Sequence, residues 1–141
     1  MIMTKTLGQK TNTKQGVFHD LTVVDATGSV ATSYAAKLFA DYGAVVVNLE
    51  PADGFDTRTL MPLMANGDSA MHAYLHTNKQ SVVRSHPHLT DEPVLGWADL
   101  VIFDPHGLPQ ADSLFGIKTN TCAISWYGLT GPYSSMSGSD A

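Results

Sequence analysis

The chain has 141 residues, of which 43% are hydrophobic and 15% are charged, and its net charge is −5 at pH 7. This length fits one globular domain, and the acidic balance, with Lys and Arg scattered rather than clustered, argues against a nucleic-acid-binding surface. No apolar run approaches the roughly 20 residues that a membrane span needs. We therefore expect a protein that binds neither nucleic acid nor membrane.

The N-terminal segment differs in composition from the rest of the chain. Residues 1–17 are rich in Thr, Lys and Gln, and they predict a flexible arm. They lack the apolar stretch of a secretory signal, so we expect a cytoplasmic protein. The domain proper is expected to cover residues 18–141.

A strand, a helix and a second strand are predicted directly after the arm. Residues 21–24 form an apolar run, residues 25–30 carry turn and capping side chains, and residues 31–42 repeat apolar side chains at helical spacing. Gly43 suits the end of this helix, and residues 45–49 form a β-branched run. Such a unit is typically a right-handed crossover between parallel strands, with ligands bound at the strands' carboxyl ends.

The helix over residues 31–42 is predicted from its apolar side chains, which are spaced three or four residues apart: Tyr34, Ala35, Leu38, Phe39 and Tyr42.

The remaining segments predict an α/β fold, a small Rossmann-like parallel sheet with helices. The expected elements are a long loop over 51–66, a short helix over 68–75 capped by Asn66 or Asp68, strands over 79–83, 98–104 and 121–125, and a helical turn near 112–115. The connection over residues 84–97 is too short for a full crossover helix, so one face of the sheet should be thinly covered. The chain should then oligomerise or expose an apolar patch.

The turn after the first strand allows two interpretations. A dinucleotide fingerprint requires G-x-G-x-x-G, and only Gly28 is present, so an NAD site is disfavoured. The first amides of the helix, with the hydroxyls of Ser29, Thr32 and Ser33, could hold an anion. The same residues could instead form an N-cap and nothing more. Without the glycines, Glu50 at the end of the second strand is no evidence for ribose binding.

Histidine and cysteine do not predict a metal or a nucleophile. His72 and His76 would share a helix face, and His86 and His88 a strand face, but neither pair has the spacing and companions of a zinc site. We expect no bound metal. Cys122 lies in a predicted strand, and we expect an inert buried thiol.

Four segments in chain order resemble the N-terminal part of the family III CoA-transferases. Residues 24–50 are similar to the family's opening "LD-T" strand, "L-A-D-L-G-A" helix end and "V-I-K-V-E" strand; residues 50–58 to "E-P-P-G-D-x-x-R"; residues 77–82 to "N-R-G-K-R-S-V". Residues 98–102 and 125–133 resemble "A-D-V-x-V" and "S-I-S-G-F-G-Q-T-G-P-Y". The family includes formyl-CoA and carnitine CoA-transferases and α-methylacyl-CoA racemases.

The resemblance implies a Rossmann-like domain that binds CoA or an acyl-CoA thioester, in a dimer whose subunits interlock. Arg58 and Lys79 would meet the phosphate charges of CoA. The CoA-binding positions that the resemblance implies are Gly28, Ser29, Val30, Ala31, Arg58, Asn78, Lys79, Asp104 and His106. CoA would be a substrate or ligand, and no cofactor is expected to be bound covalently.

Departures from the family pattern affect the catalytic groups most. The catalytic Asp of the transferases lies beyond the "G-P-Y" segment, and Ser139 stands where the racemases have a catalytic histidine, just before Asp140. Transfer needs a carboxylate nucleophile, and racemisation needs an acid and a base. We therefore expect no catalytic residue in this chain, which would be a truncated relative or an isolated domain that relies on a homo-oligomer or a C-terminal partner segment.

Three functions remain open from the sequence. The leading one is the CoA-binding portion of a family III CoA-transferase-like protein that is not catalytic alone. The second is a degenerate structural or regulatory domain that no longer binds CoA. The third is an NAD-type module, which the missing glycines disfavour.

Overall fold

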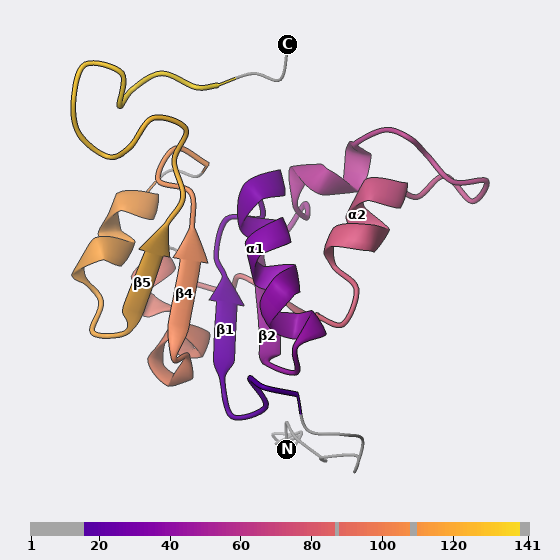
Figure 1. Ribbon diagram of the computed structural model, residues 1–141, viewed down its shortest axis with the longest axis horizontal. Helices are drawn as coiled ribbons and strands as arrows, with labels where there is room; N and C mark the ends of the chain where they lie inside the picture. Colours follow the sequence, from indigo (N-terminus) through magenta and orange to yellow (C-terminus); the bar gives the residue numbers. More distant parts are fainter. Residues whose placement is uncertain (1–15, 87, 108–109, 139–141) are drawn as a thin grey trace.

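The protein folds around a five-stranded, all-parallel sheet, seen in a computed structural model that describes residues 16–86, 88–107 and 110–138 (Figure 1). The sheet order is β3-β2-β1-β4-β5. The strands are β1 (Thr22–Asp25), β2 (Val45–Glu50), β3 (Gln80–Val83), β4 (Leu100–Phe103) and β5 (Asn120–Ala123). The helices are α1 (Val30–Asp41) and α2 (Ala70–Leu75), with 3-10 helices η1 (Asp56–Thr59), η2 (Leu89–Asp91), η3 (Pro93–Trp97) and η4 (Ala111–Gly116).

This order confirms the predicted α/β fold. Strands β1 and β2 pair in register from Thr22 opposite Val45, and β1 pairs with β4 on its other side. The chain therefore moves outward from β1 to β3 and then returns to β4, so the strand order reverses between β1 and β4. In open parallel sheets a ligand binds beside the carboxyl ends of the strands at this reversal.

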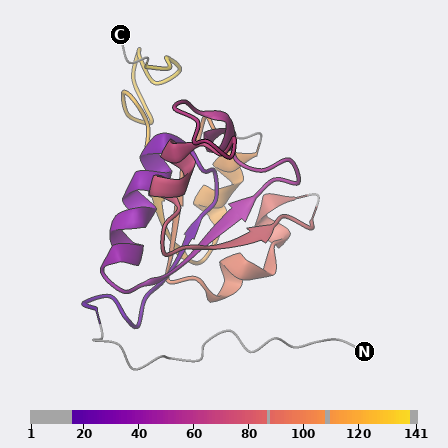
Figure 2. The ribbon, with the colours of Figure 1, turned by 90° about the vertical axis from the view of Figure 1, so that its right-hand side faces the viewer.

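Two apolar layers cover the two faces of the sheet. Val23, Val46 and Ile102 pack beneath α1, whereas Val24, Val47 and Val101 pack against the 3-10 helices. Figure 2 shows α1 on one side of the sheet and the short helices of residues 89–97 on the other. As predicted, the connection over residues 84–97 holds only 3-10 turns instead of a full helix.

The apolar side chains that predicted α1 are divided between the core and the surface. Ala35 and Phe39 pack against the core, whereas Tyr34, Leu38 and Tyr42 are 48%, 44% and 57% exposed. The residues of α1 that are buried are Thr32, Ser33, Ala36, Lys37 and Ala40. The small side chains of Ala36 and Ala40 let the helix lie close to the sheet, which leaves the larger side chains outside. Tyr34, Leu38 and Tyr42 therefore form an exposed apolar stripe along α1.

Two smaller expectations are also corrected. Ser69 caps α2 by accepting a hydrogen bond from the His72 amide at 3.0 Å, so neither Asn66 nor Asp68 is the cap. Cys122 is exposed, because β5 is an edge strand and its outer side is uncovered.

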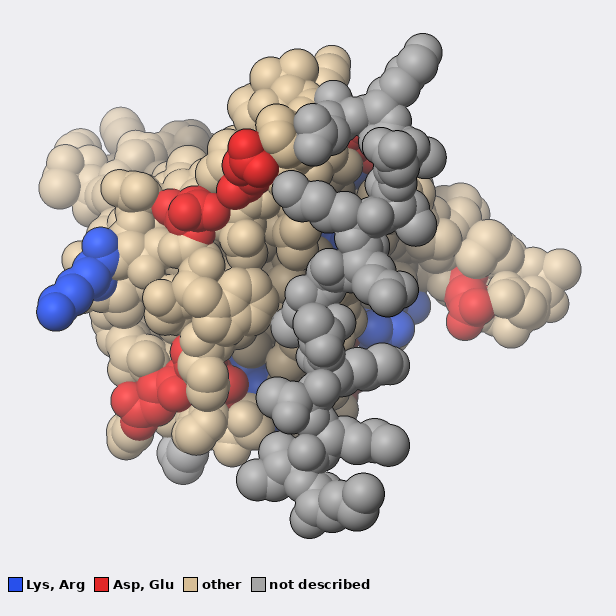
Figure 3. Space-filling view, turned by 90° about the horizontal axis from the view of Figure 1, so that it is seen from below, with Lys and Arg blue, Asp and Glu red and all other residues tan. Residues whose placement is uncertain are grey.

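On the face of the molecule in Figure 3, Lys and Arg side chains stand apart from one another. No helix in the described ranges combines the length and hydropathy needed to cross a membrane.

Most of the predicted arm lies outside the described residues, which begin at Gly16. Gly16 already packs against the backbone of Tyr42 and Gly43, and Phe18 donates a backbone hydrogen bond to Tyr42. Ser139 and Asp140 also lie outside the described residues.

Candidate functional site

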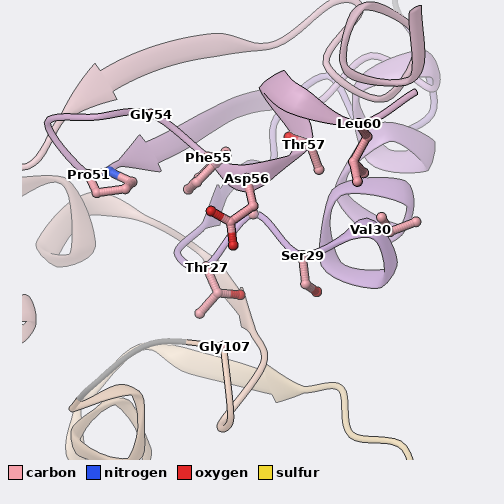
Figure 4. Close-up of a pocket in the computed structure, with 11 residues that line it drawn as sticks. Thr27, Ser29, Val30, Pro51, Gly54, Phe55, Asp56, Thr57, Leu60 and Gly107 are labelled. Atoms are coloured by element: carbon pink, nitrogen blue, oxygen red, sulfur yellow. The ribbon is translucent and has the colours of Figure 1, made fainter. Parts of the chain in front are cut away.

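A cavity of about 240 Å³ opens at the carboxyl ends of β1, β2 and β4, where the strand order reverses. The loops that follow these three strands supply its walls (Figure 4). The lining residues are Thr27, Gly28, Ser29, Val30, Pro51, Gly54, Phe55, Asp56, Thr57, Leu60 and Gly107.

The turn between β1 and α1 is held from below by a buried carboxylate. Asp25 accepts hydrogen bonds from the Gly28 amide at 3.0 Å and from the Ser33 hydroxyl at 3.1 Å. Ser29 begins the helix as its N-cap and accepts from the Thr32 amide at 3.2 Å. The turn therefore has a fixed shape, and the N-terminus of α1 is placed at the cavity wall.

Thr27 joins this turn to the loop after β4. Its hydroxyl accepts a hydrogen bond from the Asp104 amide at 2.9 Å, and the Asp104 carboxylate accepts one from the His106 amide at 2.9 Å. These contacts bring Gly107 to the cavity wall, against Thr27.

Lys79 reaches the same turn from inside the protein. Its side chain is fully buried, its Nζ donates to the Ser33 carbonyl at 2.7 Å, and it lies 3.9 Å from Asp25 Oδ2. Burial lowers the pKa of Lys79 to about 8, with Asp25 opposing the shift. Burial also raises the pKa of Asp25, and Lys79 opposes that shift. The pair is thus an internal ion pair beneath the turn.

Arg58 is engaged in a second ion pair next to the cavity. It forms a bidentate contact with Glu50, with 2.9 Å from Nε to Oε2 and 2.9 Å from Nη2 to Oε1. The Ser81 hydroxyl also donates to Glu50. Burial acts to raise the pKa of Glu50, but the hydrogen bonds from Ser81 and Arg58 outweigh it and leave this pKa below its usual range.

A chain of neutral hydrogen bonds supports the wall formed by η1. Asn48 Nδ2 lies 2.8 Å from His76 Nδ1, His76 Nε2 lies 3.1 Å from the Thr57 hydroxyl, and that hydroxyl lies 2.9 Å from His72 Nδ1. With Asn48 donating to His76 Nδ1, His76 Nε2–H donates to Thr57 and the Thr57 hydroxyl donates to His72. This single direction uses every proton once and requires both imidazoles to be neutral.

The electrostatics agree with neutral imidazoles. Burial lowers the pKa of His76 to about 3, helped by the nearby charge of Lys79. The pKa of His72 is also lowered, first by burial and then by Arg58. The described residues contain no group of three or more His, Cys, Asp or Glu placed to hold a metal ion.

Acid should weaken the fold through His76. Between its unfolded pKa near 6.5 and its folded pKa of about 3, the unfolded chain binds a proton that the folded chain does not, so stability falls as pH falls. Between pH 7 and pH 5 we expect His76 to remove about 2 kcal/mol of unfolding free energy. Urea unfolding at pH 7 and pH 5 gives the loss of unfolding free energy for the chain and for His76→Gln. The difference between the two losses measures the contribution of His76.

The exposed His88 provides the control for this experiment. His88→Gln should retain the full pH dependence of the unmodified chain. An equally steep loss of stability in His76→Gln would contradict the assignment.

The structure brings together some of the predicted binding residues and separates others. Gly28, Ser29 and Val30 line the cavity, whereas Ala31 does not. Asn78 bonds to Asp41 in the last turn of α1, about 16 Å along the helix from the cavity.

The other predicted residues differ in how they relate to the cavity. Arg58 adjoins it, and Asp104 and His106 belong to the loop that forms its rim. Lys79 is turned inward to Asp25 and Ser33. A role of any of these residues in CoA binding stays a prediction.

Sequence reasoning located the loop after β2 but missed the side chains that matter there. Phe55, Asp56 and Thr57 all line the cavity. The sequence did contain a signal for these three residues. They lie between Gly54 and Arg58, two positions that already matched the family pattern.

The strand order defines a Rossmann-like α/β domain with a cavity where the order reverses. Residues 18–86 match the family model described as CoA-transferase family III. This match identifies the segment from the start of the fold through β3 as part of that family, and it confirms the resemblance found in the sequence.

Solved structures agree with this assignment. A CAIB/BAIF family protein from Brucella suis is 26% identical, with a TM-score of 0.70 over 89% of this chain and 37% of that one. The hypothetical protein Rv3272 from Mycobacterium tuberculosis is 21% identical, with a TM-score of 0.71 over 89% of this chain and 38% of that one, and it supports the fold. The chain thus spans little more than a third of the length of these solved chains.

Proposed function

We propose that this chain is the N-terminal, CoA-thioester-binding portion of a family III CoA-transferase-like protein, and that it does not catalyse transfer or racemisation alone. The observation that supports this most is the cavity at the strand-order reversal, because the segments that build most of its wall lie within residues 18–86, the region matched to the family. A ligand in this position would contact the loops after β1, β2 and β4 together.

The chemistry of the family sets what such a portion can do. CoA transfer requires a carboxylate that attacks a thioester, and racemisation requires an acid and a base on opposite sides of one carbon. We propose that these groups come from a C-terminal partner segment or from another subunit of a homo-oligomer. The exposed apolar stripe of Tyr34, Leu38 and Tyr42 is compatible with such a partner. We expect the protein to act in the cytoplasm.

One observation favours the alternative of a structural or regulatory domain without CoA binding. Both cations that were expected to meet the phosphates, Arg58 and Lys79, are already engaged with Glu50 and Asp25. A site that depended on these two side chains for phosphate binding would have to break internal ion pairs.

Calorimetric titration with CoA, with NADH as the comparison ligand, tests the proposal. We expect a micromolar dissociation constant for CoA and no binding of NADH. Val30→Trp should weaken CoA binding at least 10-fold, because Val30 is exposed at the cavity wall and a larger side chain would fill the cavity.

Val45→Trp is the matched control, since Val45 is exposed at the start of β2, at the opposite end of the strand from the cavity. It should leave the affinity for CoA unchanged. No CoA binding by the unmodified chain would contradict the proposal and favour the structural alternative, whereas binding of NADH alone would favour a dinucleotide module.

A further inference from the structure

Asp56 gives the cavity an unexpected charge. Of the described residues that line the cavity, Asp56 alone carries an ionisable side chain. In Figure 4 its carboxylate points into the cavity, toward the space between Thr27 and Ser29. The wall thus presents a negative charge at the point where a nucleotide-binding fold would be expected to receive phosphate.

Neighbouring cations do not neutralise this carboxylate. Within the described ranges no ion pair joins Asp56 to a basic side chain. The two cations expected at the site are paired with other carboxylates, Arg58 with Glu50 and Lys79 with Asp25. The N-terminus of α1 favours negative charge at the cavity wall, and Asp56 already supplies one.

The remaining lining explains what would fit beside Asp56. Val30, Pro51, Phe55 and Leu60 give the cavity an apolar wall, while the hydroxyls of Thr27 and Ser29 and the Asp56 carboxylate supply a few polar atoms. A carboxylate accepts hydrogen bonds from O–H and N–H groups and repels phosphate. This combination suits an uncharged ligand group with apolar parts and one or more hydrogen-bond donors.

We propose that the cavity binds an uncharged, hydrogen-bond-donating part of its ligand, with Asp56 as the acceptor that sets this preference, and that phosphate groups stay outside. The inference rests on the proposed function when the ligand is CoA. In CoA such donors occur in two places, the hydroxyl and amide groups of the pantetheine arm and the hydroxyl and amino groups of the adenosine.

Titrations of the full chain with pantetheine, adenosine and inorganic pyrophosphate, followed by the backbone amide signals of Gly28 and Ser29, test the preference. We expect one of the two neutral fragments to bind and pyrophosphate not to bind. The fragment that binds identifies the source of the donor. In Asp56→Asn, the neutral fragment should bind at least 5-fold more weakly and pyrophosphate at least 5-fold more tightly.

Asp53→Asn is the matched control, because Asp53 is an exposed acid on the same loop that does not line the cavity. It removes the same charge from the chain and should change none of the three affinities. Asp56→Glu, which keeps the charge, should still exclude pyrophosphate, so a folding defect in Asp56→Asn would not leave the preference unmeasured.

The outcomes separate this inference from the proposed function. CoA binding that is unchanged in Asp56→Asn, or pyrophosphate binding to the unmodified chain as tight as to Asp56→Asn, overturns the role of Asp56 alone. Asp56-dependent binding of a neutral fragment without binding of CoA supports the role of Asp56 and overturns the CoA function. Binding of no fragment and no CoA overturns both.

Discussion

Replacing Lys79 with alanine should lower the free energy of unfolding by about 3 kcal/mol at pH 7, because the variant leaves the Asp25 carboxylate buried without its cation. Lys79 also donates a hydrogen bond to the Ser33 carbonyl in the first turn of α1, and the variant removes this bond too. Urea unfolding followed by circular dichroism measures the loss. Lys79 is therefore expected to stabilise the turn between β1 and α1, whatever its role in ligand binding.

Two controls isolate the ion pair. Lys118→Ala removes an exposed lysine and should change stability by less than about 0.5 kcal/mol. Adding Asp25→Asn to Lys79→Ala should recover part of the loss, because the amide can still accept from Gly28 and no longer carries a charge. A loss no larger than that of Lys118→Ala would contradict the buried pair.

The same variant should show a distinctive pH dependence. Burial raises the pKa of Asp25, so the folded chain binds a proton at pH values where the unfolded chain has already released it. The stability contributed by this proton is therefore lost as pH rises. Without Lys79 to oppose the shift, the destabilisation of Lys79→Ala should be smaller at pH 5 than at pH 8.

Replacing Gly28 with alanine should cost about 3 kcal/mol and close part of the cavity. Gly28 has φ +66°, a conformation that costs a non-glycine residue about 1 kcal/mol or more. A Cβ at this position would meet the ring of Phe55, and overpacking of a buried contact adds a cost of about 1–3 kcal/mol. Thermal unfolding and CoA titration of Gly28→Ala measure the two effects.

Gly67 offers a control with the same backbone requirement and no steric contact. Its φ is +89°, and a Cβ there would meet nothing within 4 Å, so Gly67→Ala reports the backbone cost alone. Phe55→Leu combined with Gly28→Ala should relieve the steric part. If Gly28→Ala destabilises no more than Gly67→Ala, the contact with Phe55 does not restrict this position.

The local elements were predictable because their signals lie within a few residues of one another. The Ser29 cap, the helix that follows it and the β-branched run of β2 each depend on neighbouring residues, and all three are found close to their predicted bounds. The family resemblance likewise depended on short runs in chain order, and residues 18–86 confirm it.

The orientation of α1 shows where local pattern fails. Tyr34, Leu38 and Tyr42 share the apolar helical spacing of Ala35 and Phe39, yet only Ala35 and Phe39 pack against the core, beside the small residues Ala36 and Ala40. Apolar periodicity cannot distinguish a face that packs on the sheet from one that is left uncovered, because both faces of this helix carry apolar side chains.

The sequence by itself determined the strand–helix–strand unit and the small parallel sheet, because hydrophobic period, capping and turn residues act over short distances, and its short motifs carried the resemblance to the family that residues 18–86 confirm. Only the tertiary structure decided that Lys79 points inward to Asp25, that Asp56 faces the cavity, and that Thr57 links two histidines. Lys79 precedes β3 and meets the last residue of β1, whereas Asp56 and Thr57 belong to the loop after β2, at the edge where the carboxyl ends of the parallel strands lie. The charges and hydrogen bonds of these side chains are therefore set by which segments become neighbours, a property that no single segment carries.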